Sequence, residues 1–169
     1  MPTLSMKAAA RCLLIPLIAF ASCKRSGVNA GAASECADGE TCYQRAQALL
    51  EKNDQERAGR SDSAAPGDLA SRAVALYQRG CDLGSGISCE SLGHWLEIGE
   101  LAPVDLERAA RLHERGCALK EFRSCDRLAH LYRDGRGVRK DAALQAKYRK
   151  LACDLAEPAM AKPTFCNDN

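Results

Sequence analysis

The stretch Arg79–Cys89, RGCDLGSGISC, places two cysteines eight positions apart across a turn that contains two glycines. The same offset returns 36 residues later in Arg115–Cys125, RGCALKEFRSC. Aligning residues 69–104 with residues 105–140 gives 12 identities in 36 positions. A fixed period of this length is typical of stacked repeats in which each unit is one supersecondary element.

Each unit has the apolar spacing of two helices. In the first unit, small and apolar residues recur at i, i+3, i+4, i+7 and i+8, as Ala73, Leu76, Tyr77, Gly80 and Cys81. A second helix is expected from about Cys89, and glycines mark the turn between the two. No stretch alternates with period two for long. The sequence therefore predicts an all-α chain, built as an α/α repeat solenoid.

The two units resemble the Sel1-like repeat (SLR) family, a relative of the tetratricopeptide repeat. The resemblance rests on ALYQRGC and CESLGHWLEIG in the first unit and on RLHERGC and CDRLAHLYRDGRGVRKD in the second. This family commonly ends its second helix with a G-x-G-V turn, here Gly135–Val138, and opens the next helix with an aspartate, here Asp141. Cysteines eight apart are similar to the cysteine-rich secreted branch of the family, which implies that each pair bridges the two helices of one repeat.

The repeats predict how the chain is divided. We expect a signal peptide at 1–22, a tether at 23–35, a degenerate N-terminal half-repeat at 36–58, a linker at 59–68, repeat 1 at 69–104, repeat 2 at 105–140, and a partial C-terminal repeat with a capping tail at 141–169. In the half-repeat, CYQRAQALLEKND is interpreted as the second helix of a unit. In the last unit, Pro158 and Pro163 interrupt what would be its second helix.

The first 22 residues have the features of an export signal. Lys7 and Arg11 precede an apolar run, CLLIPLIAF, which small residues follow. A membrane-spanning helix needs roughly 20 apolar residues, so this run is short for one, and a short uncleaved anchor is the alternative. The end of the run, FASC, resembles the bacterial lipoprotein box, which implies that Cys23 carries a lipid. Ordinary cleavage that leaves Cys23 free is the alternative there.

The residue after that cysteine bears on the location of the protein. Lys24 stands where an aspartate commonly retains lipoproteins in an inner membrane. We therefore expect an exported lipoprotein of the periplasm or outer membrane, attached to the membrane through its lipid.

The charge of the chain argues against a nucleic-acid partner. Removing residues 1–22 takes away two of the 24 basic residues and none of the 22 acidic ones, so the mature chain is neutral. The charge is uneven, however, because residues 23–103 carry 8 basic and 12 acidic side chains, whereas residues 104–150 carry 13 and 7.

Eight cysteines remain if Cys23 is lipidated, and an even number in an exported chain favours disulfides among 105 possible connectivities. Zinc sites typically use cysteines two to four residues apart and redox centres use C-x-x-C, and neither pattern occurs. The family resemblance implies bridges within each repeat. Extended to both ends of the chain, this scheme predicts the pairs Cys36–Cys42, Cys81–Cys89, Cys117–Cys125 and Cys153–Cys166. A bridge that closes nine residues contributes roughly 2.5 kcal/mol by the loop-entropy estimate.

The motifs of hydrolytic sites are missing from the sequence. Ser-x-x-Lys, Lys-Thr-Gly and His-Glu-x-x-His do not occur. His94 and His130 hold equivalent places in successive repeats, and His113 matches Tyr77 on the inward face, so we interpret them as repeat and core positions. We expect no catalytic residue, no metal and no cofactor. A peptidoglycan-binding or β-lactamase-like envelope hydrolase is the alternative, because some cysteine-rich members of the family have been linked to such activities.

The first helices are the predicted interaction face. In tetratricopeptide-like stacks the first helices line a concave face, and the resemblance implies the same here. The basic residues of that face are Arg72, Arg79, Arg108, Arg111, Arg115 and Lys147. Guanidinium groups bind carboxylates in a bidentate manner. We therefore predict an interaction module or scaffold whose protein partner in the cell envelope has an acidic segment. A merely solvated helix face is the alternative.

Overall fold

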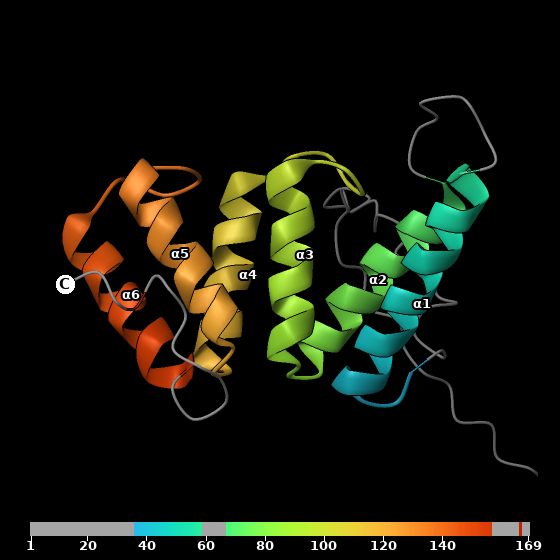
Figure 1. Ribbon diagram of the computed structural model, residues 1–169, viewed down its shortest axis with the longest axis horizontal. Coiled ribbons are helices and arrows are strands. Elements are labelled where there is room, and N and C mark those ends of the chain that lie inside the picture. The colour runs from blue at the N-terminus through green and yellow to red at the C-terminus, as the bar shows by residue number, and fades with distance from the viewer. Residues whose placement is uncertain (1–35, 59–66, 157–165, 167–169) are drawn as a thin grey trace, which may run out of the picture.

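The computed structural model describes residues 36–58, 67–156 and 166. The described residues form six helices and no strand: α1 (Gly39–Ala58), α2 (Asp68–Asp82), α3 (Gly86–Ile98), α4 (Leu106–Ala118), α5 (Phe122–Asp134) and α6 (Ala142–Ala156). They follow one another along the long axis of the molecule (Figure 1). The predicted all-α repeat solenoid is therefore confirmed. No described helix is long and apolar enough to cross a membrane.

Several predicted segments fall wholly or partly outside the described residues. The signal peptide and tether lie there, as do most of the linker at 59–68 and most of the capping tail. Helix α2 begins at Asp68, so the last residue of the predicted linker is helical.

The helices pack in a repeating order. Helix α1 packs along α2, α3 along α4 and α5 along α6, and smaller contacts join α2 to α3 and α4 to α5. Each second helix therefore packs most closely against the first helix of the next unit. Helix α1 occupies the position of a second helix relative to the unit that follows it. Gly39 at the start of α1 lies against the Gly80 carbonyl of α2, just as Gly86 at the start of α3 lies against the Gly116 carbonyl of α4.

Side-chain caps decide where the second helices begin. The Ser85 hydroxyl accepts a hydrogen bond from the Ser88 N–H (3.3 Å) ahead of α3, and Glu121 has the same capping role ahead of α5. The sequence analysis placed the start of α3 near Cys89, which was wrong by three residues. Gly86 is the first residue of the helix rather than part of the turn.

The loops between units also repeat. The N–H of Asp105 donates to the carbonyl of Leu96, and 36 residues later the N–H of Asp141 donates to the carbonyl of Tyr132, each at 3.0 Å. The two aspartate carboxylates then cap α4 and α6 by accepting N–H hydrogen bonds of 2.9 Å from the first turn. This explains why an aspartate opens each first helix.

The G-x-G-V turn has a steric reason for its second glycine. Gly99 and Gly135 end α3 and α5 with φ of 79° and 72°, in the left-handed region that glycine adopts without strain. Gly137 packs directly on the start of α4, where a Cβ would overlap the Leu106 carbonyl group. Only glycine fits this position without moving the backbone.

The core consists of small residues and leucines between consecutive helices. Leu76, Leu92 and Leu128 are fully buried, and Tyr77 belongs to the same cluster as Leu76 and Leu92. A second, smaller cluster around Ala152 packs α6 against the last repeat. The core is therefore spread along the solenoid, as expected for stacked units.

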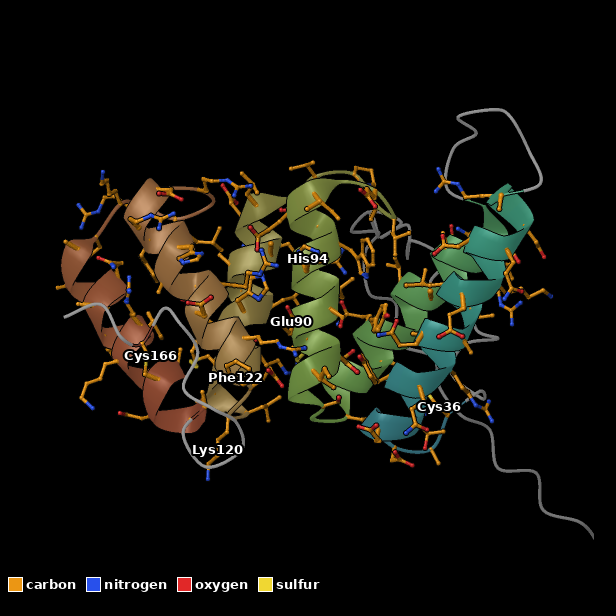
Figure 2. The ribbon with its side chains drawn as sticks, in the orientation of Figure 1. Cys36, Glu90, His94, Lys120, Phe122 and Cys166 are labelled. Atoms are coloured by element: carbon orange, nitrogen blue, oxygen red, sulfur yellow. A yellow bond between two sulfur atoms is a disulfide. The ribbon has the colours of Figure 1, made fainter. Side chains whose placement is uncertain are left out.

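Four disulfides clasp the helices. They join Cys36 to Cys42, Cys81 to Cys89, Cys117 to Cys125 and Cys153 to Cys166. The Cα–Cα distances are 4.6 Å and 4.7 Å for the two central pairs, which is ordinary disulfide geometry. Cys36 and Cys166 lie toward opposite ends of the solenoid (Figure 2). These four pairs are the ones that bridging within each unit predicts.

Candidate interaction face

The basic residues of the first helices occupy three rows of repeat-equivalent positions. Each row takes one residue from α2, one from α4 and one from α6, spaced by 36. The rows are Arg72, Arg108 and Leu144; Ala75, Arg111 and Lys147; and Arg79, Arg115 and Leu151. The structure gives these rows different roles.

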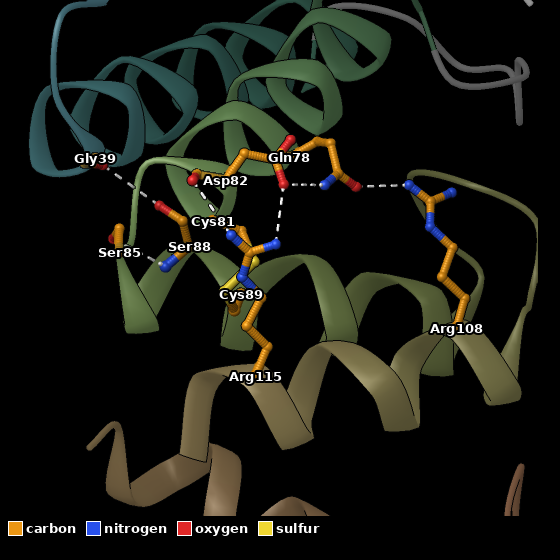
Figure 3. Close-up of a disulfide and its surroundings, with 9 residues drawn as sticks. All are labelled: Gly39, Gln78, Cys81, Asp82, Ser85, Ser88, Cys89, Arg108 and Arg115. Atoms are coloured by element: carbon orange, nitrogen blue, oxygen red, sulfur yellow. Dashed lines mark hydrogen bonds and ion pairs between the residues drawn. A yellow bond between two sulfur atoms is a disulfide. The ribbon is translucent and has the colours of Figure 1, made fainter. Parts of the chain in front are cut away.

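Two arginines of α4 reach back to α2. Arg108 donates through Nη2 to the Gln78 side-chain oxygen at 2.8 Å. Arg115 donates through Nη1 to the Asp82 carboxylate and through Nη2 to the Asp82 carbonyl, both at 3.2 Å. Figure 3 shows both side chains spanning from one first helix to the previous one, beside the Cys81–Cys89 disulfide. Both guanidinium groups are therefore already hydrogen-bonded to other residues of the protein.

Arg79 repeats the role of Arg115 one unit earlier. Its Nε donates to the carbonyl of Cys36 at 3.2 Å, so it holds the segment ahead of α1. Arg72 stands at the beginning of its row and is half-buried. Like Arg115, Arg79 thus donates to a backbone carbonyl at or beside a disulfide cysteine of the preceding unit.

The remaining row is exposed. Arg111 and Lys147 hold equivalent positions on α4 and α6, and both side chains are exposed. Arg111 has no hydrogen bond or ion pair with any residue that the structure describes, and the Lys147 ammonium lies 5.4 Å from the centre of the Tyr148 ring. Of the six predicted basic residues, these two are the ones placed toward solvent without an anionic partner in the described chain.

An aromatic pair that the sequence analysis missed borders this row. The rings of Tyr132 and Tyr148 stack at 5.7 Å with an interplanar angle of 5°, and the Tyr132 hydroxyl donates to Glu114 at 3.3 Å. Burial and the charge of Glu114 raise the pKa of Tyr148. The two tyrosines come from different helices and have no counterparts in repeat 1, so no periodic signal marked them.

A buried polar pair joins the two repeats at another place. His113 is fully buried, as expected of a core histidine, and its Nε2–H donates to the Glu97 carboxylate at 2.9 Å. Arg136 lies 3.6 Å from the other carboxylate oxygen. Burial favours a higher pKa for Glu97, but the hydrogen bond and charge of His113 and the charges of Arg127 and Arg136 hold that pKa below its usual value.

Among residues 36–58, 67–156 and 166, no group of three His, Cys, Asp or Glu side chains is placed to hold one metal ion. No sequence pattern marked Glu97, because Arg133 holds the equivalent position in repeat 2. The pair is best understood as a polar contact between α3 and α4.

Solved structures with a similar fold come from three bacteria. A Sel1 repeat protein from Oxalobacter formigenes superposes with a TM-score of 0.58 at 17% identity, over 79% of this chain and 88% of that chain. This chain adopts the Sel1-like repeat fold. Helicobacter pylori cysteine-rich protein B gives a TM-score of 0.54 at 21% identity, over 75% of this chain and 88% of the other.

The third is c5321, described as a protective antigen present in uropathogenic Escherichia coli strains and displaying an SLR fold. It gives a TM-score of 0.57 at 17% identity, and it aligns over 72% of this chain but only 23% of its own length. No protein-family model and no curated protein matches the sequence. The resemblance seen in the motifs is confirmed by these structures at the level of the fold.

Proposed function

We propose that this SLR protein is an exported, lipid-anchored interaction module of the bacterial envelope that binds an acidic segment of a partner protein through Arg111 and Lys147. The observation that carries the proposal is the exposure of these two cations at equivalent positions of successive first helices. Helices α4 and α6 both pack against α5, and an extended segment advances about 3.3 Å per residue, so a segment with several carboxylates would reach both cations. The proposal includes no catalytic step.

The flanking arginines support the choice of this row. Arg108 and Arg115 are already bound to Gln78 and Asp82, so a partner would have to displace those contacts. Arg111 is available without such a cost. Its guanidinium group offers a planar, bidentate site for a carboxylate, and the stacked tyrosine pair adds an apolar surface beside Lys147.

Export and the lipid anchor are supported by chemistry at two places in the chain. The buried disulfides of the solenoid require an oxidising compartment to form and persist. The FASC sequence ending at Cys23 is similar to a lipoprotein box. Metabolic labelling with palmitate should therefore label the wild-type chain, whereas Cys23→Ala should be unlabelled and released from the membrane fraction. A labelled Cys23→Ala chain would refute the anchor.

The partner-binding proposal is tested with a fluorescent decapeptide of alternating glutamate and alanine. We expect the purified chain to bind it at low ionic strength, and the double variant Arg111→Gln, Lys147→Gln to bind about fivefold more weakly, since each exposed ion pair contributes up to about 1 kcal/mol. The double variant Arg45→Gln, Arg139→Gln removes the same charge from exposed sites elsewhere and should bind normally. Equal weakening in both variants would rule out a specific site.

A further inference from the structure

A second surface lies at the edge where the hairpin turns gather. The start of α1, the α2–α3 turn and the α4–α5 turn lie along the lower edge in Figure 1, and Lys120 marks the last of these in Figure 2. Together they line a shallow groove of about 570 Å³. The groove runs across three successive units, so its long dimension follows the solenoid.

Two leucines give this groove repeated apolar contacts. Leu83 and Leu119 hold equivalent positions in the two turns and are 45% and 39% exposed. The next equivalent, Leu155, packs instead against the cluster around α6. Ile87, half-buried on the first turn of α3, also lines the groove. Leucines left exposed at one position in both complete repeats form a row rather than isolated apolar residues.

The same groove has an excess of negative charge. Asp38, Glu40 and Glu121 line it, against the single cation of Lys120. Asp38 accepts hydrogen bonds from Thr41, and the other two carboxylates accept from an amide side chain and a backbone N–H. None of the three forms an ion pair with a residue that the structure describes. Burial raises the pKa of Glu121, as expected for a carboxylate without a close cation.

Glycine makes the floor of the groove accessible. Gly84 has a φ of 90°, and no atom lies within 4 Å of the place where its Cβ would be. A ligand can therefore approach the backbone between the two leucines. A segment in the extended polyproline II conformation has three residues per turn and advances about 3.1 Å per residue, so every third side chain would face the groove.

We propose that this groove binds an extended peptide segment in which cationic side chains alternate with apolar ones. The apolar side chains contact Leu83 and Leu119, and the cations neutralise Glu40 and Glu121. This ligand is opposite in charge to the one proposed for the Arg111 row. The two surfaces therefore give the SLR module two independent docking sites of opposite preference, on the first helices and on the edge of turns.

The test uses a fluorescein-labelled nonapeptide of three Lys-Leu-Gly units and the purified, oxidised chain at low ionic strength. A peptide of three Glu-Leu-Gly units with the same leucines is the ligand control. We expect the lysine peptide to bind, and Glu40→Gln with Glu121→Gln to weaken binding about fivefold. The variant Glu51→Gln, Asp54→Asn removes two exposed acids of α1 away from the groove and should bind as the wild type does.

The apolar contacts have their own matched pair of variants. Leu83→Ser with Leu119→Ser should weaken the lysine peptide about fivefold or more. Ile98→Ser with Val104→Ser removes two similarly exposed apolar side chains outside the groove and should have no effect. Arg111→Gln with Lys147→Gln should also leave this peptide unaffected, so that failure of one site is distinguishable from failure of the other.

The remaining outcomes are also decisive. No binding to the wild-type chain, equal binding of both peptides, or equal weakening in groove and control variants would overturn the proposal. A dimer that the lysine peptide cannot displace from the groove would assign the surface to a second copy and overturn it as well.

Discussion

Repeat 1 and repeat 2 have the same backbone conformation at the turn between their helices, but they differ in the residue at the turn position with positive φ. Repeat 1 has Gly84 there with φ of 90°, and repeat 2 has Lys120 with φ of 65°. Both turns nevertheless make the same hydrogen bonds, from the N–H of Ser85 to the Gly80 carbonyl (2.9 Å) and from the N–H of Glu121 to the matching carbonyl (3.0 Å). The clasp and the packing of the helices therefore impose the turn even where the local residue resists it.

The core shows the same contrast. Tyr77 and His113 occupy equivalent buried positions, and the histidine requires a polar partner that the tyrosine does not share. Glu97 supplies it from the previous second helix, where Gly93 leaves space for the imidazole ring. Equivalent positions can thus hold different side chains when the neighbouring unit supplies space and a polar partner, here a carboxylate for the His113 Nε2–H.

The largest expected effect breaks the packing that both repeats share. Gly116→Val should lower the free energy of unfolding by about 3 kcal/mol, because its Cβ would lie 2.9 Å from the Ser124 Cβ and 3.2 Å from the Gly86 carbonyl oxygen. Urea denaturation with intact disulfides measures it. Ala152 holds the equivalent position in the last unit, so Ala152→Gly is the control and should cost only about 1 kcal/mol. A Gly116→Val chain as stable as the control variant would contradict the close packing.

Removing one clasp at a time tests whether the two repeats depend equally on it. Cys81→Ala with Cys89→Ala and Cys117→Ala with Cys125→Ala should each cost about 2.5 kcal/mol, since both bridges close loops of the same length. Urea denaturation monitored by circular dichroism gives both values. Losses that differ by more than about 1 kcal/mol would show that the repeats are not equivalent in the unfolded chain or in the native packing.

Exchanging the turn residues isolates the cost of the left-handed backbone. Lys120→Gly should raise the free energy of unfolding by about 1 kcal/mol, and Gly84→Lys should lower it by a similar amount. No atom within 4 Å opposes a Cβ at position 84, so the second change tests backbone strain alone. The chain with both changes should be close to wild type in thermal unfolding. Destabilisation by Lys120→Gly would mean that the lysine side chain stabilises its turn.

The smallest expected effect is a change of stability with pH that depends on His94 but not on the equivalent His130. Burial, together with the charge of Arg127, lowers the pKa of His94. Its contribution to stability is therefore complete above about pH 6.5, the usual value for the unfolded chain, and is lost as the pH falls toward the lowered value. We expect a loss of less than about 1 kcal/mol between pH 7 and pH 5 that His94→Gln abolishes. The same loss should persist in His130→Gln, because His130 is exposed.

Glu90 and Glu97 also act on His94 and favour its charged form, and His113 opposes it. The expected dependence of the unfolding free energy on pH therefore depends on whether burial and the positive charges outweigh the two carboxylates. A wild-type chain whose stability does not change between pH 7 and pH 5 would show that the carboxylates prevail. If the loss of stability on acidification disappeared equally in His94→Gln and His130→Gln, it could not be assigned to His94.

Much of the fold could be predicted because its information is periodic. The 36-residue spacing of cysteines, glycines and leucines located both complete repeats, and the resemblance to the cysteine-rich branch of the SLR family implied the disulfide pairs within them. The start of α3 was misplaced because Gly86 reads locally as a turn residue. Only its contact with the next unit, 2.9 Å from its Cβ position to the Glu121 Cβ, shows why a glycine opens this helix.

The candidate site was less predictable, because residues that share one face of a helix can differ in whether a neighbouring helix contacts them. Arg108, Arg111 and Arg115 share a stripe in the sequence, yet two of them bind α2 and only Arg111 is left without a hydrogen bond or ion pair among the described residues. Glu97 and the two stacked tyrosines break the repeat pattern, so the period that identified the fold hid them. Residues that depart from a repeat need their neighbours in space to be interpreted.

By itself, the sequence determined the helical units, their order and the cysteine spacing, since these follow from local periodicity and short loops. The tertiary structure alone decided which cations are free, which acids line the edge of the turns and which buried histidine finds a carboxylate. Those properties depend on distances between residues that are 16 to 33 positions apart in the hydrogen bonds and up to 83 positions apart in the groove, and only the stacking of one unit on the next brings them together.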